Sequence, residues 1–173
     1  MMTETNEYME QRVKKLNELR DAGIEVYPHS YDKKNDSVDI LENHDKLKSG
    51  EETKTKVSIA GRLMTLRSMC KAGFGHVQDG KGRIQIYVRK DELNEKDFEV
   101  FKKSDLGDIV GVKGFVFKTK KGEVSIRAKE FVLLSKCIRP LPEKWHGLKD
   151  KEVRYRKRYL DLITNPEVKK TFV

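Results

Sequence analysis

The chain has 173 residues, of which 36% are hydrophobic and 38% are charged, with a formal net charge of +9 and a pI near 9.4. This composition supports one compact core of modest size, and the positive charge favours an anionic partner, nucleic acid first. A basic surface that serves only solubility is the alternative. No apolar run approaches the roughly 20 residues that span a bilayer, which argues against a membrane partner.

The two cysteines and the N-terminus bear on the compartment. Cys70 and Cys137 have no CxxC spacing and no paired histidine, so we expect no metal site. Two lone thiols fit a reducing compartment. The polar, acidic N-terminus resembles neither a secretion signal nor a transit peptide, and we therefore expect a cytoplasmic protein.

The first predicted element is a helix over residues 6–22, followed by the stop residue Gly23. Apolar residues recur on one of its faces at helical spacing, namely Met9, Val13, Leu16 and Leu19. The opposite face is basic, and the pattern leaves open whether it is solvated or faces phosphates: Arg12, Lys14, Lys15 and Arg20. A second short helix is predicted over residues 39–48, closed by Gly50.

From residue 56 the pattern changes to the alternation typical of strands. Gly61 inside the first strand predicts a bulge or bend there. Turn chemistry predicts hairpins at 79–82 and 120–122. A short helix capped by Asn94 is predicted between the third and fourth strands. The predicted strands cover residues 56–67, 74–79, 83–89, 109–117 and 123–134, with the last possibly broken in two.

Three strands, a helix and two strands follow the order of an OB-fold. The predicted fold class is mainly β with flanking helices (α+β): a five-stranded Greek-key barrel preceded by an N-terminal helix. We expect an N-terminal helical segment over 1–52, the barrel over 53–138 and a connector over 139–173. A small β-barrel that binds no ligand would show the same alternation. The position of the helix between the third and fourth strands is what distinguishes an OB-fold from it.

The second and third strands carry side chains suited to binding single-stranded nucleic acid, which needs an aromatic platform, polar groups and cations. If Val77 faces the core, alternation turns the neighbouring polar and aromatic residues outward. A bulge that turns Phe74 into the core is the alternative. The carboxylate of Glu123 would repel phosphate, so we expect it to accept a hydrogen bond from a base. The alternative is that Glu123 is only a solvated charge at the end of a strand. The candidate surface comprises Phe74, His76, Gln85 and Tyr87, bordered by Arg62, Arg67, Glu123 and Ser125.

No catalytic pattern is visible, because the chain has no GxSxG, P-loop or HExxH motif. Residues 149–163 predict a basic helix, and Thr164-Asn165-Pro166 predicts a stop followed by a new helix over 167–173. A natural domain rarely ends on a newly opened apolar helix. We therefore expect the chain to be the N-terminal part of a longer protein.

Three stretches carry a resemblance to a known family: AGFGHVQDGKGRIQIYVRKDEL, DLGDIVGVKGFVFKTKKGEVSI and RPLPEKWHGLKDKEVRYRKRYLDLITNPEVKKTF. From about Tyr8 to Val173 the chain resembles the N-terminal portion of class II lysyl-tRNA synthetases. The related aspartate and asparagine enzymes share the barrel but not the KTKKGE hairpin or the RYRKRYLDLI connector.

The resemblance implies an anticodon-binding barrel ahead of a catalytic domain that adenylates lysine and transfers it to tRNA(Lys). By motif position, Phe74 stacks on the central anticodon uridine, Gln85 hydrogen-bonds that base and Glu123 contacts a base nearby. Arg62 and Arg67 are candidate backbone or base contacts. His76 is a further candidate, although Gly75 and His76 stand where many members have bulkier or hydroxyl residues.

The family's ATP- and lysine-binding motifs fall beyond Val173, so ATP and Mg²⁺ are expected in the parent enzyme and no cofactor in this chain. The parent enzyme is expected to be a homodimer, and the present chain to be inactive and largely monomeric. A free-standing OB-fold protein that binds single strands without catalysis is the alternative from a different functional class.

Overall fold

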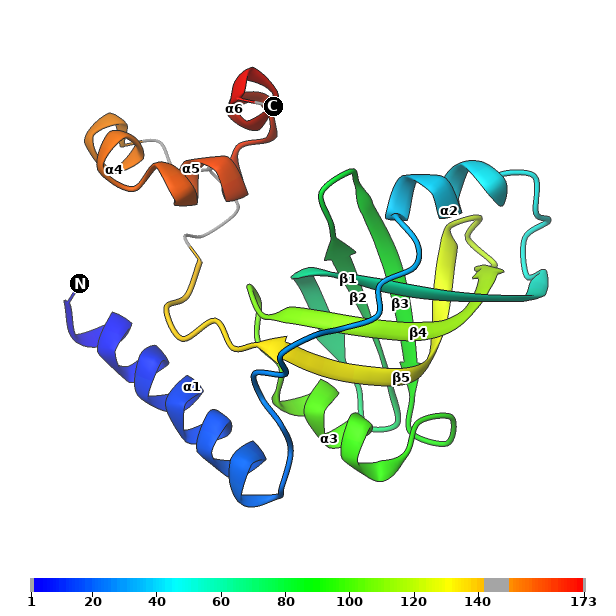
Figure 1. Cartoon of the computed structure of the whole chain (residues 1–173), viewed down its shortest axis with the longest axis horizontal. Coiled ribbons are helices and arrows are strands. Elements are labelled where there is room, and N and C mark those ends of the chain that lie inside the picture. Colours follow the sequence, from blue (N-terminus) through cyan, green and yellow to red (C-terminus); the bar gives the residue numbers. More distant parts are fainter. Residues whose placement is uncertain (1, 142–149, 173) are drawn as a thin grey trace. The chain divides into compact units, whose positions relative to one another are not determined.

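The computed structural model describes residues 2–141 and 150–172, and residues 1–138 and 139–173 form two compact units (Figure 1). The first unit is built on a barrel of five strands in the order β1-β2-β3-β5-β4. β3 pairs with β5 in parallel, and the other neighbours are antiparallel. The strands are β1 (Glu52–Ser68), β2 (Ala72–Gln78), β3 (Arg83–Arg89), β4 (Ile109–Lys118) and β5 (Val124–Ser135).

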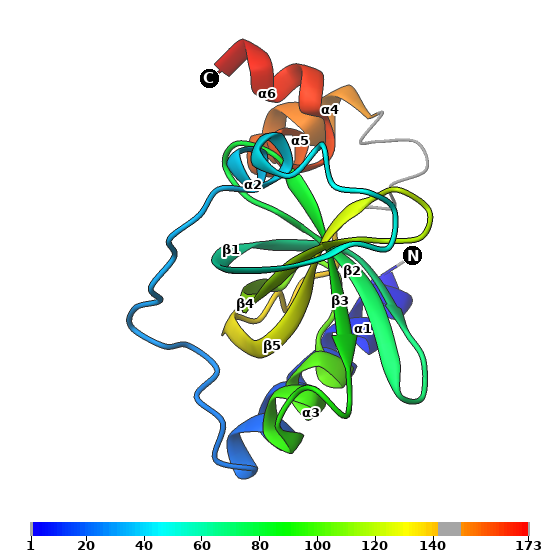
Figure 2. The same ribbon diagram turned by 90° about the vertical axis from the view of Figure 1, so that its right-hand side faces the viewer.

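The barrel interior follows from the alternation in each strand. On β3, for example, Ile84, Ile86 and Val88 are at most 2% exposed, whereas the residues between them face outward. Helix α3 (Glu95–Lys103) joins β3 to β4 and closes one end of the barrel, and α2 (Ser37–Asn43) lies at the other end (Figures 1 and 2). The OB-fold prediction is confirmed by this connectivity. Asn94 caps α3 as predicted, because its side chain accepts the N–H of Asp97.

The sequence predicted a bulge or bend at Gly61, but the bulge of β1 against β2 lies at Met64. A further register shift occurs between Glu52 and Lys56, where β1 pairs with β4. The register with β2 shifts between Leu63 and Thr65, which leaves one extra residue in β1. Gly61 has another role, since an added Cβ would overlap the backbone carbonyl of Gln78. The bulge reverses the alternation beyond it, so Arg62 and Thr65 turn to the same outer face. Strand β5 is continuous, with a register shift opposite β4 in place of the possible break.

Helix α1 (Met2–Asp21) begins earlier than predicted and ends as predicted at Gly23, which has a φ of +70°. The N–H of Ile24 bonds to the carbonyl of Leu19, the pattern of a glycine-terminated helix. Two members of its basic face turn toward the rest of the unit. Arg12 donates to the carbonyl of Cys137 at 2.5 Å, and Lys15 pairs with Asp105 at 2.6 Å.

Helix α2 (Ser37–Asn43) is shorter than the predicted 39–48 and starts earlier. The Asp79 carboxylate accepts both the backbone N–H and the hydroxyl of the first helical residue, which holds the start of the helix in place. At the other end, Nδ1 of His44 donates to the carbonyl of Ile40 at 2.9 Å and replaces the next helical backbone bond. Both ends are therefore set by side chains.

The second unit contains α4 (Lys151–Arg156), α5 (Arg158–Thr164) and α6 (Pro166–Phe172). The single basic helix predicted over 149–163 is wrong, because the chain breaks at Lys157, and residue 149 lies outside the described residues. In a straight helix, positions seven apart are separated by about 10 Å. The break brings Arg154 Nε within 3.0 Å of the buried Asp161 carboxylate. The predicted restart at Pro166 is confirmed.

Candidate nucleic-acid interface

The strand register arranges the outward side chains of β1, β2, β3 and β5 in two rows. Each row takes one residue from each strand, because directly paired residues point to the same face of a sheet. The aromatic row consists of Arg67, Phe74, Tyr87 and Arg127. The polar row consists of Thr65, His76, Gln85 and Ser125.

The aromatic row is a stacked ladder with cations at both ends. Phe74 is half-buried on the outer face and stacks on Tyr87 with ring centroids 4.6 Å apart. Tyr87 in turn lies 6.0 Å from Phe117 of β4, over which the guanidinium of Arg127 is placed at 5.4 Å. This arrangement offers a π surface for a base, with the positive charge of Arg67 beside it. Both terminal nitrogens of Arg127 pair with the carboxylate of Glu52.

The polar row is joined by hydrogen bonds through Glu123, which directly precedes β5. Gln85 Nε2 donates to one oxygen of Glu123 at 2.6 Å, and His76 Nε2 lies 3.0 Å from the other. Thr65 Oγ1 lies 2.7 Å from His76 Nδ1. Ser125 Oγ donates to Gln85 Oε1 at 2.9 Å. The predicted trio of His76, Gln85 and Glu123 therefore forms one cluster.

The two arginines predicted to border the surface differ in their surroundings. Arg67 is exposed and lies directly opposite Phe74. Arg62 pairs with Gln78 further along β1, and its Nη1 donates to the carbonyl of Gly107 at 2.7 Å. Arg62 thus holds the loop before β4, whereas Arg67 belongs to the aromatic row.

Sequence reasoning missed the contributions of Thr65, Phe117 and Arg127. The face of the barrel to which Thr65 points can be assigned only once the bulge at Met64 is known. The other two come from the β4–β5 hairpin, where Phe117 pairs with Ser125. Alternation in that hairpin was a usable signal for both residues.

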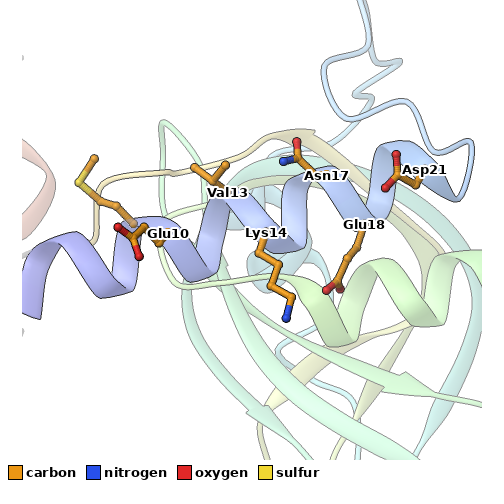
Figure 3. Close-up of a pocket in the computed structure, with 7 residues that line it drawn as sticks. Glu10, Val13, Lys14, Asn17, Glu18 and Asp21 are labelled. Carbon is orange, nitrogen blue, oxygen red and sulfur yellow. The ribbon is translucent and has the colours of Figure 1, made fainter.

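The described residues contain no cluster of three or more potential metal-ligating side chains, and none of their helices is long and apolar enough to cross a membrane. An open groove runs along α1, away from the barrel rows (Figure 3). It is lined by Met9, Glu10, Val13, Lys14, Asn17, Glu18 and Asp21.

Comparison with known proteins gives matches to the barrel and to the whole chain. Residues 57–134 match the family of OB-fold nucleic acid binding domains. The chain is 53% identical to a lysine–tRNA ligase of Oceanobacillus iheyensis, and 51% identical to lysine–tRNA ligases of Staphylococcus epidermidis and Staphylococcus aureus. Each alignment covers 100% of this chain and 36% of the relative, so the chain spans about a third of their length.

Proposed function

Since the chain is a homologue of the lysine–tRNA ligases over its whole length and carries an OB-fold nucleic acid binding domain, we propose that it recognises the anticodon of a lysine tRNA. The barrel face that bears the aromatic and polar rows is the binding surface in this proposal. The parent protein would join lysine to that tRNA with ATP and Mg²⁺, in the cytoplasm and as a homodimer. The ligase activity is proposed from the names of the relatives, and the other properties from the resemblance to class II lysyl-tRNA synthetases.

The observation that carries the proposal is the position of the Phe74–Tyr87 stack next to the Gln85–Glu123 pair. A base that stacks on Phe74 presents its edge to donors and acceptors in the neighbouring row, because adjacent rows on one face of a strand pair are only two residues apart. Phe74 would hold the central anticodon base, Gln85 and Glu123 would contact base edges, and Arg67 would contact the backbone.

A free-standing barrel that binds single strands without sequence preference is the alternative. The alignment extends through residues 139–173, outside the matched OB-fold segment, which favours the ligase assignment. The two functions differ in their response to sequence, since stacking alone is tolerant of the base whereas edge contacts are not.

Phe74→Ala tests the proposal in a binding assay with two RNA stem-loops, one bearing UUU in the loop and one with that loop scrambled. Stacking on an aromatic side chain contributes ~1–3 kcal/mol per base. At ~1.4 kcal/mol per decade, the variant should bind the UUU loop about tenfold to a hundredfold more weakly, and the scrambled loop almost unchanged. Tyr27→Ala is the control, because Tyr27 is an exposed aromatic residue outside the barrel strands and lies under the guanidinium of Arg20 from α1.

Equal binding of both loops by the unaltered protein would favour the free-standing alternative. Equal weakening of both loops by Phe74→Ala, or unfolding of that variant, would contradict the stacking role of Phe74. Circular dichroism of each variant separates loss of binding from loss of fold.

A further inference from the structure

We propose that Thr65, His76 and Ser125 are positioning residues, which hold Gln85 and Glu123 as a fixed donor–acceptor pair that selects keto bases over amino bases. The inference rests on the proposed function, because it assumes that a base stacks on Phe74. In this proposal the choice of base depends on a network of hydrogen bonds across four strands, which we call the relay. The three positioning residues in that network need not contact the RNA.

The amide of Gln85 has one favourable orientation. Its Oε1 accepts from Ser125 Oγ at 2.9 Å, and its Nε2 donates to Glu123 at 2.6 Å. A flipped amide would place its carbonyl oxygen against the carboxylate, where two acceptors repel. Ser125 is fully buried, and its hydroxyl lies closer to Gln85 Oε1 than to its other acceptor, the backbone carbonyl of Glu123 at 3.3 Å. The second N–H of Gln85 is then available to a base in a fixed direction.

The carboxylate of Glu123 is held on its other oxygen by His76. An ionised carboxylate only accepts, so a neutral His76 carries its proton on Nε2 and donates to Glu123. Its bare Nδ1 then accepts from the Thr65 hydroxyl at 2.7 Å. The backbone supports this arrangement, since the N–H of Glu123 donates to Thr119 Oγ1 at 3.0 Å. Glu123 therefore keeps its rotamer although its side chain is 48% exposed.

A fixed N–H next to a fixed carboxylate matches some base edges and opposes others. Uracil and guanine present a carbonyl oxygen beside a ring N–H, which pair with the amide N–H and the carboxylate. Cytosine and adenine held in the same orientation present an amino group and a bare ring nitrogen. Both contacts then become repulsive, donor against donor and acceptor against acceptor. The relay keeps the donor of Gln85 and the acceptor of Glu123 in these positions. Without it, the two side chains can rotate and form hydrogen bonds with either class of base.

The test measures binding of four stem-loops that differ only in the central loop base, U, G, C or A. The unaltered protein should prefer U and G. Thr65→Val and Ser125→Ala should each reduce the ratio of U to C affinity by about tenfold, equivalent to ~1.4 kcal/mol, mainly by improving binding of C. Thr65→Ser keeps the hydroxyl and should restore the ratio. Thr53→Val is the matched control, because this β1 hydroxyl donates to the carbonyl of Val116, outside the row.

A second readout gives its main result on the unaltered protein. Nitrogen NMR of the His76 ring in the unaltered protein at neutral pH should show the proton on Nε2, and Thr65→Val should lessen that preference. A proton mainly on Nδ1 overturns the relay, and so does a U to C ratio that Thr65→Val and Ser125→Ala leave unchanged. If Phe74→Ala nonetheless weakens the UUU loop selectively, the proposed function stands and only the relay fails. If Phe74→Ala has no selective effect, the proposed function itself fails.

Discussion

Replacing Asp79 with asparagine should destabilise the barrel unit substantially. The side chain of Asp79 is 3% exposed and accepts four hydrogen bonds, from the N–H and hydroxyl of Ser37 and from the N–H groups of Lys81 and Gly82. Asparagine keeps one acceptor oxygen and turns an NH₂ group toward one of these donors. Hydrogen bonds to a charged group contribute about 1.5–3 kcal/mol each. We expect a loss of about 2–3 kcal/mol in the free energy of unfolding.

The stability lost in the Asp79→Asn variant should depend on pH. Burial by itself raises the pKa of the Asp79 carboxyl, but the hydrogen bonds from Gly82, Ser37 and Lys81 outweigh it and lower the pKa below its ordinary value. The ionised carboxylate therefore stabilises the fold fully above the unfolded pKa of about 3.9. This contribution disappears as the pH falls through the lower folded pKa. The difference in the free energy of unfolding between the unaltered protein and Asp79→Asn should be complete at pH 7 and should shrink below about pH 4.

Urea unfolding followed by circular dichroism at pH 7 and pH 3 measures both effects. Asp91→Asn is the control, since Asp91 is 61% exposed and pairs only at the surface with Arg89. It should change the free energy of unfolding by no more than about 0.5 kcal/mol. A variant as stable as the unaltered protein at pH 7, or a difference that persists undiminished at pH 3, would refute the assigned role of Asp79.

Three further predictions concern the core, a close backbone contact and the salt dependence of binding. Lys136→Met should cost about 3–5 kcal/mol in urea unfolding, because it leaves the fully buried carboxylate of Asp108 without its cation at 2.7 Å, and adding Asp108→Asn should recover part of the loss. Gly61→Ala should lower stability by about 1–3 kcal/mol through overlap with the carbonyl of Gln78, whereas Gly80→Ala meets no atom and should have little effect. Affinity for the UUU stem-loop should fall linearly with the logarithm of salt concentration, with a slope of about −0.7 per phosphate contact; an affinity that does not change with salt would rule out the phosphate contacts.

Local signals in the sequence were sufficient for most of the fold. Strand alternation identified the outward and inward faces of β3, and Asn94 and Gly23 marked helix ends. The order of the elements then specified the barrel, because few topologies accept three strands, a helix and two strands. The location of Phe74 and Gln85 on paired strands also followed from the tight turn between β2 and β3. These features depend on residues close together in the chain, so a pattern of a few residues contains the information.

The tertiary structure decided what depends on residues far apart in the chain. The bulge at Met64, which brings Thr65 and Arg62 to one face, results from the pairing of β1 with two neighbouring strands. Helix α2 starts at Ser37, whose N–H donates to the carboxylate of Asp79, 42 residues away in the chain. Glu123 meets His76 across 47 residues only after the barrel closes. Periodicity indicates which way a side chain points, but the partner that it meets depends on strand register, which closure of the whole barrel determines.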